Sequence, residues 1–190
     1  MSLALTFVQP PVLPEILSEL TAKSFKTSTS HDGATLTAFD LFIGKTKIGR
    51  VYEDDWSGDI MLDEVNSDAL KAFDDYRTRP DIDKFIIEQN SGMSDRNWAL
   101  IAIHVIFRDI NGHKSITRKS VKNLMVGSRN RYICVSWPKR NLADISAGSL
   151  QKEIPKLIDA AAKKGVPTTI LNTPEQLKSL GVQFTEVKQS

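Results

Sequence analysis

The residues most able to do chemistry in this chain are a run of cations between residues 111 and 143. This stretch contains eight Lys or Arg and no Asp or Glu. Closely spaced cations neutralise phosphates, and aromatic rings beside them stack on bases, so the combination is typical of nucleic-acid-binding proteins. We expect a polyanion-binding surface formed by Lys114, Arg118, Lys119, Lys122, Arg129, Arg131, Lys139, Arg140, Ser149 and Lys152, with Tyr132 and Trp137 as candidate stacking residues. A solvated basic face and a contact for an acidic protein surface are the alternatives.

Ser149 and Lys152 belong to this set because a helix is predicted to begin there. The free N–H groups at a helix N-terminus bind anions, and Gly148 leaves room for a close backbone approach. Lys152 in the first turn would oppose the helix dipole, which a bound phosphate or carboxylate would explain. The alternative is structural, with Ser149 as the N-cap and Glu153 offsetting Lys152.

Residues 53–95 carry the opposite charge, with thirteen Asp or Glu against four Lys or Arg. Glu53, Asp55 and Asp59 are weak candidates for a divalent-cation site, because hard cations prefer carboxylate oxygens. Their spacing does not match an EF-hand loop, and a solvated hairpin end explains the same residues. We therefore predict no metal site and no cofactor. Trp56, inside this run, is expected in the core of the hairpins.

No catalytic motif of high specificity occurs in the sequence. Gly44-Lys45-Thr46 invites comparison with a phosphate-binding loop, but Phe39 stands where that motif needs its first glycine. His104, in an apolar stretch, is expected to be a hydrogen-bonded core histidine. Cys134 alternates with apolar neighbours and is expected to be a buried, inert thiol. The sequence therefore favours a protein that is not an enzyme.

The composition is that of a soluble globular protein, with 41% hydrophobic and 25% charged residues. A single cysteine cannot form an internal disulfide, which indicates a reducing compartment. The longest apolar run, Trp98–Ile103, is far too short for a membrane span, and the N-terminus lacks the positive region of a signal peptide. We expect a cytoplasmic protein without a membrane partner.

The first half of the chain predicts hairpins followed by helices. Residues 3–8 suit a strand, 13–20 a helix after Pro14, and 26–33 a loop. Alternating apolar residues then predict an antiparallel meander, and Asn66 is the predicted cap of the first covering helix. The remaining predicted elements of this half are strands 39–43, 48–52 and 59–65, a helix after Asn66, and a second short helix from Pro80 to about Gln89.

The second half predicts one buried helix followed by a strand–helix–strand unit. Ser94 is the predicted cap of a helix over 98–110, and Asn111-Gly112 is expected to end it. Strand 132–137, the helix from Ser149 to Gly165 and strand 168–171 imply a parallel pair with a right-handed crossover. The other predicted elements are a short helix over 117–125, a helix capped by Thr173, and an edge strand over 182–187.

These elements predict an α+β fold: an antiparallel β-meander near the N-terminal half, several covering helices and a C-terminal β-α-β unit in a mixed sheet. One domain over residues 1–190 is expected, with possible sub-units at 1–93 and 94–190.

Three functions remain open at this stage. The first is a non-enzymatic cytosolic binding protein that contacts a polyanion, nucleic acid first, through a basic surface at about residues 114–152. The second is a protein-interaction or inhibitory protein with opposed acidic and basic faces, which includes pairing of two copies into a homo-oligomer. The third is a metal-dependent phosphodiesterase that would use carboxylates from residues 53–64.

Overall fold

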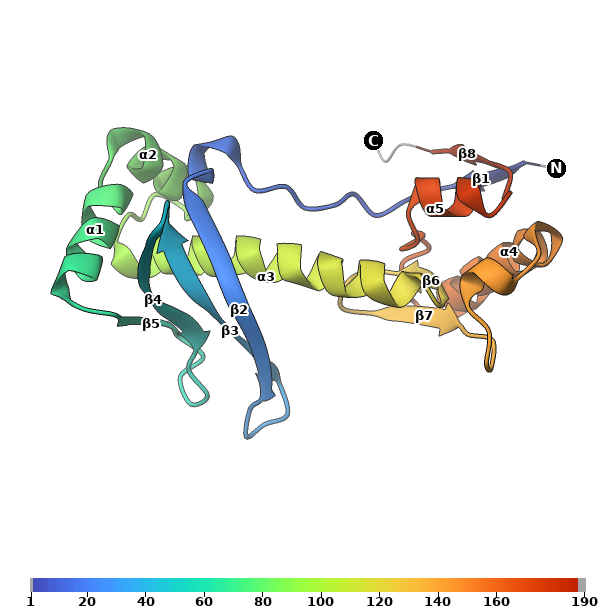
Figure 1. Cartoon of the computed structure of the whole chain (residues 1–190), viewed down its shortest axis with the longest axis horizontal. Coiled ribbons are helices and arrows are strands. Elements are labelled where there is room, and N and C mark those ends of the chain that lie inside the picture. Colours follow the sequence, from blue (N-terminus) through green and yellow to red (C-terminus); the bar gives the residue numbers. More distant parts are fainter. Residues whose placement is uncertain (1, 188–190) are drawn as a thin grey trace. The chain divides into compact units, whose positions relative to one another are not determined.

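The structure is a computed structural model that describes residues 2–187, and it forms two compact units (Figure 1). The meander unit is Pro11–Asn111. The terminal unit combines Met1–Pro10 with Gly112–Ser190. The sequence suggested sub-units at 1–93 and 94–190, whereas this division falls between Asn111 and Gly112, inside a helix that spans Arg96–Ser120.

The sheet of the meander unit has four antiparallel strands in the order β2-β3-β4-β5 (Figure 1). They are β2 (Leu20–Thr29), β3 (Thr35–Ile43), β4 (Thr46–Glu53) and β5 (Ile60–Glu64). The expected meander is therefore confirmed, and it gains one strand. Along β3 the alternation buries Phe39 and Leu41 completely, as a sheet with one covered face requires.

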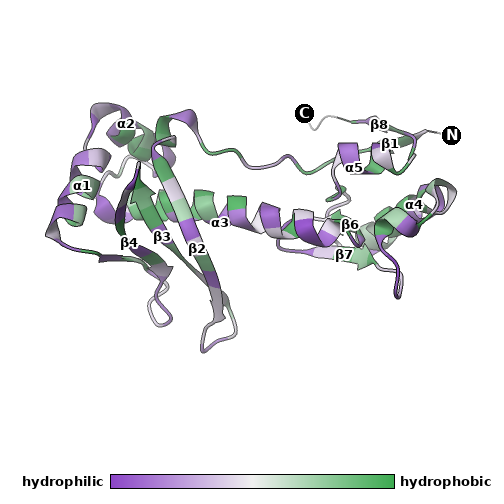
Figure 2. Ribbon diagram, viewed as in Figure 1, coloured by the Kyte–Doolittle hydropathy of each residue, from purple (hydrophilic) through white to green (hydrophobic). Residues whose placement is uncertain are grey.

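The added strand, β2, begins at the last residue of the predicted helix over 13–20 and covers residues 26–29 of the predicted loop over 26–33. Only a single turn of 3₁₀ helix, η1 (Glu15–Leu17), forms after Pro14. As an edge strand, β2 exposes most of its side chains, so its Ser, Thr and Lys residues imitate a loop in the sequence (Figure 2). Its register with β3 shifts between Lys23 and Lys26.

Two short helices, α1 (Ser67–Arg77) and α2 (Pro80–Gln89), follow the sheet as predicted. The Asn66 side chain accepts the Ala69 N–H at 2.8 Å and caps α1. Phe73 of α1 packs in one core with β3 and β4, where it is fully buried. The sequence predicted these two helices correctly because their local signals agree with the way the helices pack in the fold.

Helix α3 (Arg96–Ser120) is longer than predicted and contains both the expected helix over 98–110 and the first four residues of the one over 117–125. Its cap is Asp95, whose carboxylate accepts the Trp98 N–H at 2.8 Å, and not Ser94. Asn111-Gly112 does not end it. A glycine costs a helix only about 1 kcal/mol, which the buried Phe107 and Ile116 on either side offset.

The terminal unit contains two small sheets. Strands β6 (Leu124–Gly127) and β7 (Tyr132–Val135) form an antiparallel hairpin, and β1 (Leu3–Leu5) pairs in parallel with β8 (Phe184–Glu186). Ile170 bridges Phe7 in parallel and Val126 in antiparallel orientation. The predicted α+β class with mixed strand directions is confirmed. The parallel pair is β1 with β8, however, and not 132–137 with 168–171.

Helix α4 (Ala147–Lys163) packs its apolar stripe against the β6–β7 hairpin (Figure 2). Leu150, Ile154 and Ala161 are fully buried in this core. The 3₁₀ turn η2 (Leu142–Asp144) precedes α4, and α5 (Pro174–Ser179) begins at the predicted cap Thr173. Over residues 2–187, no helix has the length and apolar character that crossing a membrane demands.

The continuity of α3 can be tested at Gly112. A Cβ at this position meets no atom within 4 Å, so Gly112→Ala adds helix propensity without a clash. We expect it to stabilise the protein by about 1 kcal/mol, and Gly112→Pro to destabilise it by about 3 kcal/mol. Thermal unfolding followed by circular dichroism measures both. If α3 instead ended at Asn111, neither substitution would shift the midpoint.

Candidate polyanion-binding surface

The last turns of α3 and the turn after it carry four exposed cations, which we call the α3 cation group: Lys114, Arg118, Lys119 and Lys122. Lys114 and Arg118 are four residues apart and therefore share one face of the helix. The Lys122 N–H donates to the Lys119 carbonyl at 3.1 Å, so the turn continues the end of the helix. Ile116, on the other face, is buried.

The α3 cation group has no counter-charge. Within residues 2–187, none of its four members forms an ion pair with a carboxylate. Cations elsewhere commonly do, and the ion-paired ones are Lys47, Arg50, Arg77, Arg79, Lys84, Arg96, Arg108, Lys156, Lys163 and Lys178. The group therefore leaves its positive charge open to an external anion.

The turn that carries Lys122 is held in place by the side chain of Asn172, which is only 1% exposed. Its Oδ1 accepts the Met125 N–H at 2.8 Å. Its Nδ2 donates to the carbonyls of Ser120 at 3.0 Å and Asn123 at 2.9 Å. Gln176 of α5 donates a further bond to the Ser120 carbonyl at 2.8 Å. The end of α3 is thereby tied to β6 and α5.

The two candidate stacking residues are both half-buried. Lys119 Nζ lies 3.1 Å from the Tyr132 hydroxyl and 5.6 Å from the centre of its ring, which also packs against Ile116. Trp137 packs against the core under α4. Neither ring is therefore a fully open platform for a base.

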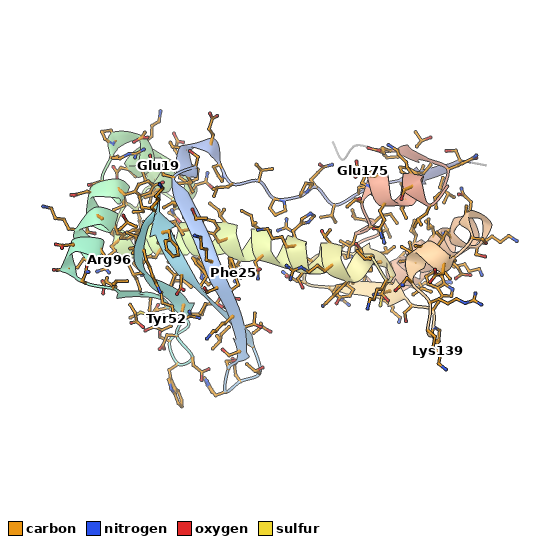
Figure 3. All side chains as sticks on the ribbon, in the orientation of Figure 1. Glu19, Phe25, Tyr52, Arg96, Lys139 and Glu175 are labelled. Carbon is orange, nitrogen blue, oxygen red and sulfur yellow. The ribbon has the colours of Figure 1, made fainter. Side chains whose placement is uncertain are left out.

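The remaining cations of the basic run lie at other places in the terminal unit. Arg131 Nη2 donates to the Lys164 carbonyl at 3.0 Å, at the C-terminal end of α4. Arg129 is half-buried. Lys139 and Arg140 are exposed on the loop after β7, where Figure 3 shows Lys139 projecting from the ribbon. Arg131 and Lys139 thus flank opposite ends of β7.

Ser149 does not cap α4. The cap is Ser146, whose Oγ and carbonyl accept the Ser149 N–H at 3.3 and 2.9 Å. The helix therefore begins at Ala147, and the Ser149 N–H already has a partner. Lys152 is exposed on the side of α4 away from its core.

The basic run is consequently spread over more than one face of the terminal unit. Ile133 and Val135 of β7 pack on the α4 side, whereas Tyr132 packs with Ile116 on the α3 side. The α3 cation group and Lys152 thus belong to opposite faces of the β6–β7 hairpin. The α3 cation group contains four of the eight cations of the basic run within nine residues.

The three weak metal candidates are not brought together. Glu53 accepts the Thr37 N–H at 2.5 Å and lies 3.3 Å from Arg108 Nη1. Asp55 accepts the His31 N–H at 2.9 Å. Between residues 2 and 187 no cluster of three His, Cys, Asp or Glu side chains is suited to a metal ion.

His104 is 1% exposed and stacks on Phe39 with ring centres 5.7 Å apart, so its expected core position is confirmed. The expected hydrogen bonds are absent: neither ring nitrogen has a partner with suitable geometry, although Nε2 lies 3.3 Å from Glu53 Oε1. Burial lowers the pKa of His104, the Glu53 carboxylate opposes this shift, and Arg108 adds to it.

Two residues expected in the interior are on the surface. Trp56 is 82% exposed in the loop between β4 and β5, where it stacks on His31 with ring centres 4.7 Å apart. Asp54 organises that loop by accepting the N–H groups of Trp56 and Ser57. Cys134 is exposed on β7, which has a single partner strand.

Compared with models of known protein families, with curated proteins and with solved structures, the chain has no match.

Asn172 provides a stability test. Asn172→Ala leaves the Met125 N–H and the Asn123 carbonyl without a partner, whereas the Ser120 carbonyl keeps its bond from Gln176. Each buried unsatisfied group costs about 1–3 kcal/mol. We expect a loss of about 3 kcal/mol in urea unfolding. Asn130→Ala, on an exposed loop, is the matched control and should change stability by less than about 0.5 kcal/mol. Equal effects would contradict the role of Asn172.

His104 makes stability depend on pH. Because its pKa in the folded state is below the ordinary 6.5, the unfolded state binds the proton more readily. The contribution of His104 to the free energy of unfolding is fully present above pH 6.5, and it is lost as the pH falls through the lower pKa that His104 has in the folded state. Urea unfolding between pH 7 and about 5 should therefore show a smaller loss in His104→Leu than in the wild type.

His31 serves as the control of opposite sign. Its hydrogen bond to Asp55 raises the pKa of His31, so this residue stabilises the fold below pH 6.5 and less above it. His31→Leu should therefore enlarge the loss of stability on acidification. A change in the same direction in both variants would contradict the assignment.

Proposed function

We propose that this protein is a non-enzymatic, cytosolic binding protein that holds a polyanion, nucleic acid in the first place, on the α3 cation group. The observation that carries the proposal is that, among the described residues, no carboxylate neutralises the positive charge of that group. Four exposed cations lie on one helix end and its following turn without any carboxylate partner among the described residues. A local positive field of this kind attracts and steers polyanions.

The acidic run supports the choice of the basic surface over an acidic one. Many of its carboxylates already have cationic partners inside the meander unit. Asp74 pairs with Arg77 at 2.9 Å, Asp81 with Arg79 at 3.1 Å, and Glu64 pairs with Arg96. Much of the negative charge is therefore compensated within the fold.

The proposed mode of binding is contact with phosphates. Lys119 covers Tyr132, and Trp137 packs against a core, so base stacking contributes little. Phosphate contacts carry no sequence information, and binding should therefore depend weakly on sequence. Lys139 and Arg140, exposed on the loop after β7, are candidates for further contacts with a longer strand.

Salt dependence tests this mode. Four phosphate contacts predict that the logarithm of the binding constant falls with the logarithm of salt concentration, with a slope of about −3.6 for duplex DNA. For a single strand the slope should be about −2.8. Fluorescence anisotropy with labelled DNA and RNA measures both. Absence of binding to either nucleic acid at low salt would contradict the proposal.

A matched pair of triple variants locates the surface. Lys114→Ser, Arg118→Ser and Lys122→Ser together should weaken binding at least tenfold at low salt and reduce the size of the slope by about 3. The control removes three exposed lysines of the meander unit that form no ion pair with any residue between 2 and 187: Lys26→Ser, Lys45→Ser and Lys71→Ser. Both triples change the net charge equally, so an equal effect would show that total charge decides, and the proposed site would be wrong.

A further inference from the structure

A hollow in the terminal unit has the size and the walls of a small-molecule site. Its volume is about 330 Å³, near the lower end of the range for ligand pockets. Residues 7–10 after β1, His113 of α3, residues 171–175 before and at the start of α5, and Glu186–Val187 form its walls. None of these belongs to the α3 cation group.

Hydrogen bonds hold these walls in place. The Val8 N–H donates to the Ile170 carbonyl at 3.0 Å, and the Val187 N–H donates to the Leu5 carbonyl at 2.8 Å. Asn172, which also lines the hollow, makes the buried hydrogen bonds that tie this segment to β6. The shape of the hollow is therefore set by the fold before any ligand arrives.

Much of the lining is apolar. Phe7 and Leu171 are buried side chains, and Pro174 and Val187 lie nearer the surface. Such walls suit a short hydrocarbon or aromatic body, because burying apolar area stabilises a complex by about 25 cal/mol per Å².

The charged groups in the lining have one sign. Glu175 is exposed and, within residues 2–187, its carboxylate has neither an ion pair nor a hydrogen bond. Glu186 is paired with Lys178 at 3.0 Å. Among the lining residues that the structure describes, none is Lys or Arg.

His113 adds a neutral polar group. Burial and the nearby Arg129 lower the pKa of this imidazole, so it is uncharged near neutral pH. Its Nδ1 is buried without a hydrogen-bond partner. Within residues 2–187, the lining thus offers an unpaired carboxylate and an uncharged imidazole, and no cationic side chain.

We propose that this hollow binds a small organic cation, an ammonium or guanidinium group on a short apolar body. The cationic group lies against Glu175, and the apolar body packs on Phe7 and Leu171. This site is independent of the proposed nucleic-acid surface and takes a ligand of opposite charge.

Three probes of the same shape and different charge test the proposal: 2-phenylethylammonium, 2-phenylethanol and 3-phenylpropionate. Saturation-transfer NMR and amide shifts of the full chain report binding and its location. We expect the ammonium to bind most tightly, the alcohol more weakly and the acid weakest, with shifts at Val8, Leu171 and Val187. Binding of the acid as tightly as the ammonium, or shifts confined to other residues, would overturn the proposal.

Variants separate charge from shape. Glu175→Gln should weaken the ammonium about fivefold, the upper end for an exposed ion pair, and leave the alcohol unchanged. Glu15→Gln, an exposed carboxylate of the meander unit, is the control and should change neither. Val187→Trp fills the hollow from its half-exposed edge and should abolish both. Unchanged ammonium binding in Glu175→Gln would overturn the assignment, whatever the result for nucleic acid.

Discussion

The terminal unit depends on one buried amide, the side chain of Asn172. Regular secondary structure leaves three backbone groups unpaired near it: the Ser120 carbonyl at the end of α3, the Asn123 carbonyl and the Met125 N–H at the start of β6. Asn172, Ser120 and Met125 are each only 1% exposed, so a group here without a partner would cost free energy. A single amide, with two donors and one acceptor oxygen, satisfies all three, and this fixes where the helix stops and where the strand begins.

The buried hydrogen bonds of Asn172 explain how the α3 cation group can be ordered without forming ion pairs. The α3 cation group sits on a helix end whose position is set by buried hydrogen bonds, so it needs no surface carboxylate to order it. The meander unit is different, because there Asp74, Asp81 and Glu64 pair with neighbouring arginines. The contrast between an open basic surface and a compensated acidic one follows from these contacts and is invisible in the net charge.

The same segment that ends α3 also serves the hollow. His113 is half-buried and lines it, while Lys114, the next residue, is exposed and belongs to the cation group. Consecutive helical residues point about 100° apart, so one stretch of helix contributes to two surfaces. Asn172 contributes to both as well, since it lines the hollow and holds the turn that carries Lys122.

The sequence by itself determined what depends on neighbouring residues. Alternation predicted β3, β4 and β5, and Asn66 and Thr173 marked two helix starts. The helical period of its apolar residues predicted α4, although the cap is Ser146 and not Ser149. The basic run could also be identified from the sequence alone. The tertiary structure alone decided the features that depend on distant partners. Gly112 stays helical because the helix packs on both sides of it, and polar β2 is a strand because β3 offers its edge. Trp56 lies outside, where it stacks on His31 between β2 and β3, and the cations divide over two faces because β7 alternates between two cores. In each case packing energy between residues far apart in the chain outweighs a local preference of about 1 kcal/mol.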